Sequence, residues 1–281
     1  MLRVADFSLR HTVESGQPLT FHSRYSAGNG IEKLVYTTQK GRIDVRFSGT
    51  GLRYFFEGNY TKASAGKEVV RRLGIETNMD KAYAAIGTDK FMLDAIGRCR
   101  GMRVTANDPW ETALCFVISQ FNNIKRIRGI IGRLMGQFGE EFGGTRLFPG
   151  PEAIAAADLG SIRACGTGFR DKYIKNAAEQ FAYSFEPERL YSMGYDGAKD
   201  ALMELDGVGD KVADCILLFG YGKMEAFPID VWIKRTIEQV YFKGRKKSVA
   251  RIHEFADLTW PGWQGYAQQY IYHFGRMNSI G

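Results

Sequence analysis

The chain has few cysteines and no long apolar segment, and both shortages narrow the classes of protein that it fits. Only four cysteines occur among 281 residues: Cys99, Cys115, Cys165 and Cys215. No two of them form a CxxC pair, so the sequence implies neither a zinc motif nor a disulfide framework. No apolar run reaches the roughly 18 residues of a membrane-spanning helix, and the N-terminus lacks the apolar core of a signal peptide. We therefore expect a protein that is neither secreted nor embedded in a membrane.

Positive charge is in modest excess. The chain has 38 lysines and arginines against 31 acidic residues, a net charge of +7 and a pI near 9.1. This balance fits a polyanionic partner but is weak evidence alone, because many basic proteins bind no nucleic acid. The length suggests one large or two modest domains with a sizeable core.

Residues 1–75 differ in pattern from the rest of the chain. Short β-branched or aromatic segments at 7–9, 19–21, 33–37, 43–47 and 52–56 alternate with glycine-rich turns, which predicts an antiparallel sheet. Helical periodicity dominates residues 76–281. The expected fold class is α+β, with an N-terminal antiparallel β domain packed on an all-α body.

The central stretch, residues 203–235, predicts a helix, a tight turn and a second helix over about 196–221. Gly207, Val208 and Gly209 form the turn. Two glycines around one apolar residue suit a turn with positive φ, and Val208 would pin the two helices together. The free N–H groups that open the second helix favour a phosphate, so the turn is a candidate for holding a DNA backbone.

Two ionisable residues flank this turn. Lys211 falls in the first turn of the second helix, where the helix dipole does not favour an ammonium. Asp230 follows Pro228 and Ile229 and is a candidate N-cap of the next helix. A surface lysine and an ordinary cap would account for most such pairs.

The pattern Leu-x-Gly-Val-Gly-x-Lys-Val-Ala-Asp-Cys, followed by Pro-Ile-Asp, resembles the helix–hairpin–helix DNA glycosylase superfamily. More narrowly, it is similar to the 8-oxoguanine DNA glycosylase/lyase family. The resemblance implies a helical body of two lobes, with Lys211 as nucleophile and Asp230 as its electrostatic and acid–base partner. No cysteine follows Cys215, so the iron–sulfur loop of the endonuclease III group is absent.

The resemblance also implies a base pocket built from both ends of the chain. Gly16 would offer its carbonyl to the N7 hydrogen that 8-oxoguanine has and guanine lacks, a contrast of donor against acceptor. Gln268 would meet the Watson–Crick edge of the base, and Tyr272 would stack on it. These two residues stand at i and i+4. Cys215, one helical turn from Lys211, would meet the other face.

Two further segments match DNA-contacting motifs of the family. Asn122, Asn123 and Arg126 follow a predicted buried helix that begins after the Asp108 cap. They match the loop that fills the gap left by the flipped base, with Arg126 contacting the orphaned cytosine. The position of the usual gap-filling asparagine carries Phe121, so whether Phe121 or an asparagine fills the gap stays open.

Phe169 and Arg170 match an aromatic wedge and a second arginine for the cytosine. Two residues depart together from the family pattern. Trp232 and Gly275 stand where eukaryotic members carry a histidine and a carboxylate. A local polar contact is thus replaced at both of its ends.

The resemblance implies a DNA repair glycosylase with associated lyase activity that excises 8-oxoguanine, paired with cytosine, from duplex DNA. It implies a monomer in the cytoplasm, associated with the nucleoid, or in the nucleus. The chemistry needs no cofactor or metal, although a structural monovalent or divalent cation at the hairpin is compatible with the superfamily. Two alternatives remain: a glycosylase for another damaged base, and a non-catalytic helix–hairpin–helix DNA-binding protein.

Overall fold

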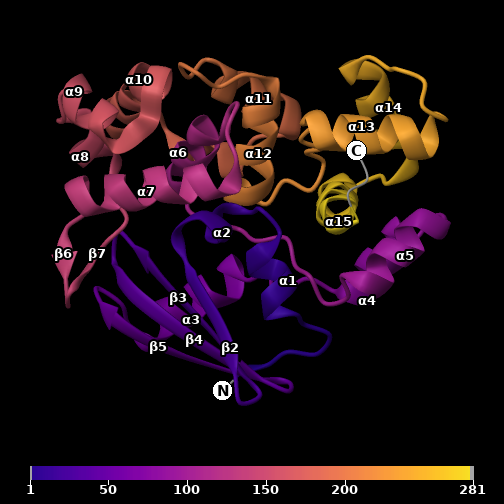
Figure 1. Cartoon of the computed structure of the whole chain (residues 1–281), viewed down its shortest axis with the longest axis horizontal. Helices are drawn as coiled ribbons and strands as arrows, with labels where there is room; N and C mark the ends of the chain where they lie inside the picture. The colour runs from indigo at the N-terminus through magenta and orange to yellow at the C-terminus, as the bar shows by residue number, and fades with distance from the viewer. Residues whose placement is uncertain (1, 279–281) are drawn as a thin grey trace.

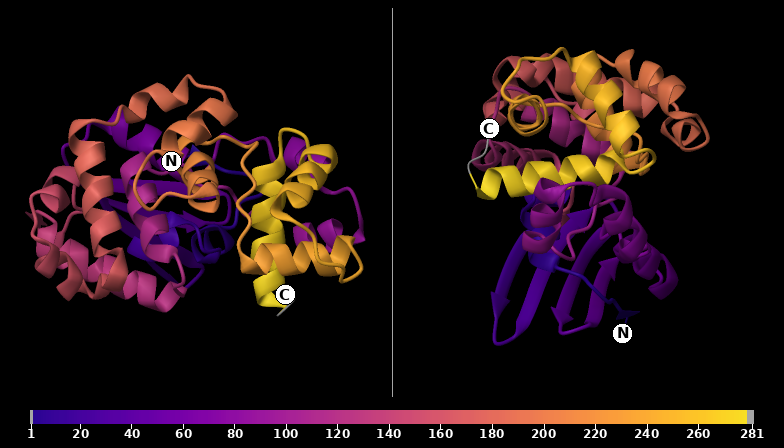
Figure 2. Two further views of the ribbon diagram at one scale, coloured as in Figure 1. Left: turned by 90° about the horizontal axis from the view of Figure 1, so that it is seen from above. Right: turned by 90° about the vertical axis from the view of Figure 1, so that its right-hand side faces the viewer.

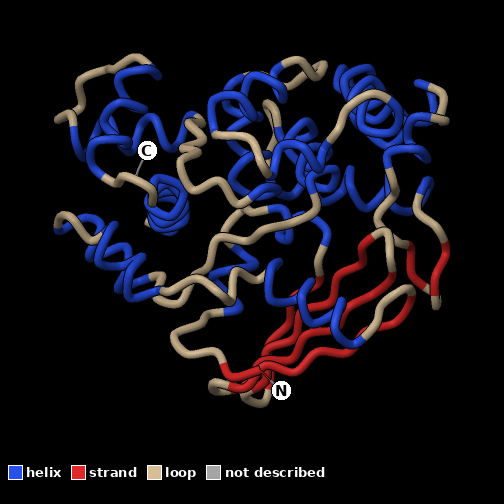
Figure 3. The backbone as a smooth tube through the Cα atoms, turned by 180° about the vertical axis from the view of Figure 1, so that it is seen from behind, coloured by secondary structure: helices blue, strands red, loops and turns tan. Residues whose placement is uncertain are grey.

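An antiparallel sheet lies against a larger body of helices in the computed structural model, which describes residues 2–278 (Figure 1). The five-stranded sheet has the order β1-β5-β4-β3-β2, and a separate hairpin pairs β6 with β7. The strands are β1 (Leu2–Arg3), β2 (Arg24–Gly28), β3 (Ile31–Thr38), β4 (Gly41–Ser48), β5 (Gly51–Gly58), β6 (Glu141–Phe142) and β7 (Thr145–Arg146). Seen from behind, the strands gather at one end of the molecule (Figure 3).

Helices make up most of the remaining chain. They are α1 (Leu9–Glu14), α2 (Pro18–His22), α3 (Lys62–Arg72), α4 (Met79–Ile86), α5 (Lys90–Arg98), α6 (Pro109–Ser119), α7 (Ile124–Phe138), α8 (Pro151–Ala155), α9 (Leu159–Ile162), α10 (Asp171–Tyr183), α11 (Tyr195–Met203), α12 (Asp210–Tyr221), α13 (Val231–Tyr241), α14 (Val249–Thr259) and α15 (Gln264–Met277). Short π- and 3-10 turns occur at η1 (Arg163–Thr167), η2 (Gly168–Arg170) and η3 (Pro187–Tyr191). Within residues 2–278, no helix is long and apolar enough to cross a bilayer.

The predicted strands are confirmed in part. Segments 33–37, 43–47 and 52–56 form β3, β4 and β5, whereas the strands predicted at 7–9 and 19–21 are wrong. Ser8 caps α1 instead, and its side chain accepts a hydrogen bond from the His11 N–H at 3.2 Å. Pro18 occupies the first turn of α2, where its missing N–H costs nothing. The turn at residues 15–17 therefore joins two helices rather than two strands.

The two parts of the chain bury separate hydrophobic cores. One core lies between the sheet and its covering helices, and the other runs through the helical body. In the body, α12 packs on α6 and α11, while α15 packs on α4, α5 and α13. These two groups of helices form two lobes, and in side view α15 crosses the boundary between the helices and the sheet (Figure 2).

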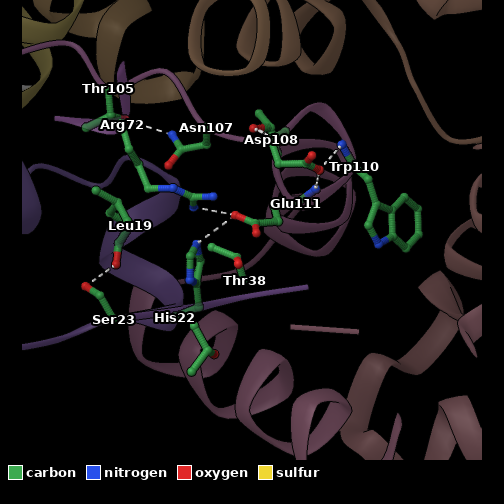
Figure 4. Close-up of polar contacts among 12 residues, drawn as sticks. Leu19, His22, Ser23, Thr38, Arg72, Thr105, Asn107, Asp108, Trp110 and Glu111 are labelled. Carbon is green, nitrogen blue, oxygen red and sulfur yellow. Dashed lines mark hydrogen bonds and ion pairs between the residues drawn. The ribbon is translucent and has the colours of Figure 1, made fainter. Parts of the chain in front are cut away.

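A buried ion pair joins the β domain to the helical body. Arg72, at the end of α3, donates to the Glu111 carboxylate of α6 at 2.5 Å, and each side chain is only 1% exposed. The buried His22 of α2 approaches the same carboxylate at 3.7 Å, and Figure 4 shows both side chains converging on it. Because a buried charge needs a partner, this pair fixes α3 against α6, and His22 packs α2 beside the same carboxylate.

Candidate active site

A cleft of about 960 Å³ opens between the two lobes of the helical body. Most of the predicted site residues line it, although they come from distant parts of the sequence. The predicted residues in its lining are Gly16, Phe121, Asn122, Asn123, Gly209, Lys211, Cys215, Asp230, Trp232, Gln268 and Tyr272. The predicted residues outside its lining are Arg126, Phe169, Arg170, Gly207, Val208 and Gly275.

The predicted helix–turn–helix consists of α11, a short turn and α12. Gly207 has φ +80°, and a Cβ at this position would lie 2.7 Å from the Cβ of Tyr173, so glycine is required. Gly209 has φ −95° and serves as the N-cap of α12, so only one of the two glycines has the positive φ that we expected. Val208 is buried between the helices, and its N–H donates to the Leu205 carbonyl at 3.0 Å.

Lys211 projects from the first turn of α12 into the cleft. Its side-chain amine lies 3.5 Å from the Ser119 hydroxyl and 5.1 Å from the centre of the Phe116 ring. Cys215 lies one turn further along α12 and is buried. Burial raises the pKa of its thiol to about 12, so Cys215 is a neutral thiol at pH 7 and a weak nucleophile. The amine of Lys211 is thus the better nucleophile on this wall.

Asp230 is held in place as the N-cap of α13. Its carboxylate accepts a hydrogen bond from the Ile233 N–H at 2.7 Å, as predicted. Burial raises the pKa of the carboxyl group, while that N–H and the positive charges of Lys211 and Arg276 act in the opposite direction. The carboxylate therefore has a fixed orientation and a neighbourhood of positive charge, which suits a group that stabilises a developing cation.

Gly16 and Tyr272 form a close contact at the far end of the cleft. Gly16 has φ +80°, and a Cβ at this position would lie 2.8 Å from the Cε1 atom of Tyr272. The Gly16 N–H donates to the Thr20 hydroxyl at 3.0 Å. The buried Gln17 donates to the Arg103 carbonyl and accepts from the Thr105 N–H. Gln17 thus anchors the turn, and only glycine fits against the tyrosine ring.

Gln268 presents an unpaired polar atom at the cleft. Its Nε2 donates to the Pro228 carbonyl at 3.2 Å, while the buried Oε1 has no hydrogen-bond partner. An unpaired buried oxygen is costly, so a donor from a bound molecule would be favoured there. Tyr272 follows one turn later, with the Arg276 guanidinium 5.4 Å from the centre of its ring.

The loop between α6 and α7 exposes Phe121 and folds its two asparagines back on the protein. Phe121 is 92% exposed and has φ +49°. Asn122 donates to the Ile118 carbonyl at 3.1 Å. Asn123 caps α7 by accepting from the Arg126 N–H at 3.0 Å, and the Arg126 side chain is exposed. Hydrogen bonds within the protein hold both asparagine side chains, whereas the Phe121 side chain projects into solvent.

Phe169 and Arg170 lead into α10, directly after a turn in which Gly166 and Gly168 both have positive φ. Phe169 is 60% exposed, whereas Arg170 is only 4% exposed. The Arg170 guanidinium donates to the carbonyls of Gln120 at 2.9 Å and Phe121 at 3.3 Å. In the structure it supports the neighbouring loop, so contact with a cytosine would require these bonds to be exchanged.

The sequence reasoning assigned no role to three residues that shape the site. Phe116 and Ser119 contact the Lys211 amine, and Arg276 lines the cleft beside Tyr272. Arg276 stands four residues after Tyr272 and eight after Gln268, so its position on the same helix face was readable from the spacing. Trp232 lines the cleft at 41% exposure, and Gly275 is buried within α15.

Several known proteins resemble this chain in fold and in sequence. A probable N-glycosylase/DNA lyase of Methanothermobacter thermautotrophicus is 29% identical, with 99% of this chain and 96% of that one covered. The structure of MBOgg1 in complex with a low affinity DNA ligand matches with a TM-score of 0.88 and 30% identity, over 99% of this chain and 95% of that one. A Clostridium acetobutylicum 8-oxoguanine glycosylase/lyase, bound to duplex DNA with cytosine opposite 8-oxoG, matches with a TM-score of 0.85 and 24% identity over 98% and 93% of the two chains.

The family match covers the hairpin and both predicted catalytic residues. Residues 114–261 match the HhH-GPD superfamily base excision DNA repair protein model. This span includes the turn at Gly207, the lysine at position 211 and the aspartate at position 230. The resemblance stated from the sequence is confirmed at this level: the chain belongs to the HhH-GPD superfamily of base excision DNA repair proteins.

Proposed function

We propose that this protein is a bifunctional DNA glycosylase and lyase that excises 8-oxoguanine from duplex DNA. The observation that carries the proposal is that Lys211 and Asp230 line one cleft with Gly16 and Gln268. A primary amine, a fixed carboxylate and a wall of polar groups are the parts that amine-mediated base excision needs. The Methanothermobacter relative, named a probable N-glycosylase/DNA lyase, supports the same activity.

The reaction assigned to Lys211 forms and then uses a covalent bond to the sugar. The neutral amine attacks C1′ of the flipped nucleotide, and the C1′–N9 bond breaks with its electron pair going to the base. The Asp230 carboxylate stabilises the positive charge that develops on the sugar. Ring opening gives a Schiff base. Loss of a C2′ proton then breaks the C3′–O bond and releases the 3′ phosphate, which is the lyase step.

The base pocket fits an oxidised purine. A base cannot be attacked inside the stack, so it must be turned out into the cleft. The Gly16 carbonyl is the acceptor for the N7–H of 8-oxoguanine, and guanine offers an acceptor at that position. The unpaired Oε1 of Gln268 is available to the donors of the Watson–Crick edge. Tyr272 and Cys215 would enclose the two faces.

The rest of the duplex would contact the turns and loops beside the cleft. Gly207, Val208 and Gly209 would hold the phosphate backbone of the lesion strand at the N-terminus of α12. Phe121 would fill the gap left by the flipped base, and Phe169 would wedge into the stack.

Arg126 and Arg170 would donate to the orphaned cytosine. Excision opposite each of the four bases tests this preference, and equal rates would contradict it. We predict a monomer, which sedimentation with and without DNA would check.

We propose that the chemistry needs no cofactor. A structural monovalent or divalent cation at the hairpin stays a prediction. The Leu205 and Gly207 carbonyls there each accept one hydrogen bond, from the Val208 N–H and the Gln120 amide. Each oxygen retains a second lone pair that a cation could use. The single-turnover excision rate of folded protein saturated with DNA should be the same before and after treatment with a chelator, and a lower rate of this bound complex that a divalent ion restores would refute the proposal.

Borohydride trapping on duplex DNA with 8-oxoguanine opposite cytosine tests the function directly. We expect a covalent adduct with the wild-type protein and none with Lys211→Gln, because glutamine has no nucleophilic amine. A matched control, Lys67→Gln, removes an exposed lysine of α3 and should still give the adduct. Base release without an adduct would remove Lys211 from the nucleophile's role.

The alternatives give different results in the same assay. A glycosylase for another damaged base would form the adduct on a different member of a lesion panel. A non-catalytic DNA-binding protein would bind the duplex with neither adduct nor base release. The second alternative would need no lysine and aspartate in a common cleft, so the geometry favours the enzyme.

A further inference from the structure

Three side chains of types that bind metals meet where α1, α5 and α15 come together. His11 comes from α1, Cys99 is the C-cap of α5, and His273 comes from α15. One ligand atom of each lies within 4.8 Å of the other two. The Nδ1 atom of His11 and the Nε2 atom of His273 are 3.0 Å apart. Residues separated by up to 262 positions in the chain are thus brought to one point.

The distances suit a tetrahedral metal ion after a small adjustment. Zinc binds imidazole nitrogen at about 2.0–2.1 Å and thiolate sulfur at about 2.3 Å. Tetrahedral angles then place two nitrogens roughly 3.3 Å apart and a nitrogen and a sulfur roughly 3.6 Å apart. The two imidazole nitrogens would need to separate by about 0.3 Å. The Cys99 sulfur lies within 4.8 Å of a nitrogen of each ring and would need to approach by no more than about 1.2 Å. Two imidazoles and one thiolate form a donor set that zinc and copper favour.

The burial of the cluster suits a structural metal site, which is closed off from solvent. Cys99 is fully buried, His273 is 6% exposed, and His11 is partly buried. The Nδ1 atom of His11 and the Nε2 atom of His273 share a hydrogen bond, so one of these two nitrogens carries a proton. On metal binding that proton would move to the other nitrogen of the same ring, which frees both lone pairs for the metal. Metal binding would displace the proton of the Cys99 thiol, which passes to solvent.

A second cluster of side chains that could bind a metal, this one mainly acidic, provides a contrast. Asp210, Asp214 and His253 also lie within 4.8 Å of one another. A lysine of the protein already balances the charge of these carboxylates, because the Lys199 ammonium lies 2.8 Å from Asp210 and 3.0 Å from Asp214. No lysine or arginine forms an ion pair with the His11, Cys99 and His273 cluster in the described part of the chain, so its donors are free of such a competitor.

We propose that His11, Cys99 and His273 form a structural site for a divalent transition metal, zinc being the best match. The fourth position would hold water. The site would clamp α1 to α15, the elements that bring Gly16 and Tyr272 together. The buried Gln269 of α15 already donates to the Ser15 carbonyl at 2.8 Å, so a metal would reinforce an existing contact. The site would be separate from the chemistry at Lys211.

Equilibrium dialysis of the full-length, reduced protein against zinc tests the site. We expect one zinc per chain in the wild type, and binding weakened at least ~10-fold in His273→Asn and in Cys99→Ser, since each loses one ligand. Two matched controls, His253→Asn and Cys165→Ser, change a histidine and a buried cysteine elsewhere and should bind zinc as the wild type does. Equal binding by all five proteins would overturn the proposal.

Spectroscopy of the unaltered protein keeps the test independent of variant folding. Cobalt(II) in the site should give the charge-transfer band of a thiolate–cobalt bond, and X-ray absorption of the zinc form should show one sulfur with nitrogen and oxygen ligands. Zinc should also raise the melting temperature of the wild type and leave that of Cys99→Ser unchanged. A cobalt spectrum without thiolate charge transfer, or a zinc shell of oxygen and nitrogen alone, would show that the three side chains are ordinary core packing.

Discussion

The two sides of the cleft differ in how much of their structure exists before DNA binds. On the base-pocket side, Gly16, Gln268 and Tyr272 are fixed by packing and hydrogen bonds within the protein. On the DNA-facing side, Phe121 and Phe169 are 92% and 60% exposed. The first side is built into the hydrophobic core, and the second stands outside it.

This difference separates two kinds of function. A pocket that is already shaped can discriminate between bases without spending binding energy on ordering itself. Under the proposed function the exposed side would enter a DNA stack, which requires its apolar groups to be exposed in the free protein, as Phe121 and Phe169 are. Arg170 combines features of both sides: its guanidinium is hydrogen-bonded to the Gln120 and Phe121 carbonyls in the free protein, and a contact with DNA would have to replace these hydrogen bonds. Substitutions on the pocket side should therefore alter stability or chemistry, and substitutions on the exposed side should alter DNA binding alone.

Asp230→Asn should give the largest effect and isolate charge from structure. Asparagine is as good an N-cap as aspartate, so α13 should keep its start and stability should change by less than about 0.5 kcal/mol. The variant loses the negative charge that stabilises the cationic sugar, and excision under single-turnover conditions should fall about 100- to 1000-fold. Quenched time courses with 8-oxoguanine opposite cytosine measure the excision rate. A rate within about threefold of the wild type would show that Asp230 is only a helix cap.

Gly16→Ala should damage the pocket side through both strain and contact. The added methyl group would lie 2.8 Å from the Tyr272 ring at φ +80°. We expect a loss of about 2 kcal/mol in stability together with slower excision, as Tyr272 is pushed from its place. Gly30→Ala is the matched control, because Gly30 has φ +71° with nothing within 4 Å of the added atom. Equal effects of the two changes on excision would mean that the contact with Tyr272 does not shape the pocket.

Much of the geometry of the candidate site could be predicted because its signals are local. The spacing of Lys211 and Cys215 on one helix, and the cap at Asp230, depend on a few neighbouring residues. The strands predicted at 7–9 and 19–21 failed because three-residue windows cannot distinguish a period of two from a period of 3.6. The signals of the true helices, Ser8 as a cap and Pro18 in a first turn, were present in the same segments.

Other features could not be read from the sequence because they depend on tertiary contacts. The bonds of Arg170 join carbonyls about 50 positions away. The positive φ of Phe121 belongs to a loop that packs against the hairpin, where Gln120 donates to the Gly207 carbonyl at 2.9 Å. The sequence predicted many of the residues that line the cleft, while the conformation and hydrogen bonds of each one came only from the structure.

His22 should make the anchoring of α2, and hence of the pocket side, sensitive to acid. Burial, followed by the positive charge of Arg72, lowers the pKa of His22 to about 3, against an ordinary value of about 6.5. Between these values the unfolded chain binds a proton that the folded chain does not. The stability contributed by neutral His22 is therefore fully present above pH 6.5 and is lost as the pH falls, by about 2 kcal/mol at pH 5.

Chemical denaturation of the wild type and His22→Gln between pH 7 and pH 5 checks this sign. The variant should be less stable at pH 7, and its free energy of unfolding should fall less steeply below pH 6.5. Parallel curves for the two proteins would show that His22 is not the titrating group.

Phe121→Ala should give the smallest effect, and it should be confined to DNA. Because the side chain is 92% exposed, its removal exposes no new core and should change stability by less than about 0.5 kcal/mol. Stacking of an aromatic ring on bases contributes about 1–3 kcal/mol, so affinity for the lesion duplex should fall about 10-fold. Phe55→Ala, a 51% exposed phenylalanine on β5, provides the control and should leave affinity unchanged. If Asn122→Ala weakened lesion binding while Phe121→Ala did not, an asparagine would be the residue that fills the gap. Because the Asn122 amide is hydrogen-bonded in the free protein, the loop would then have to rearrange when DNA binds.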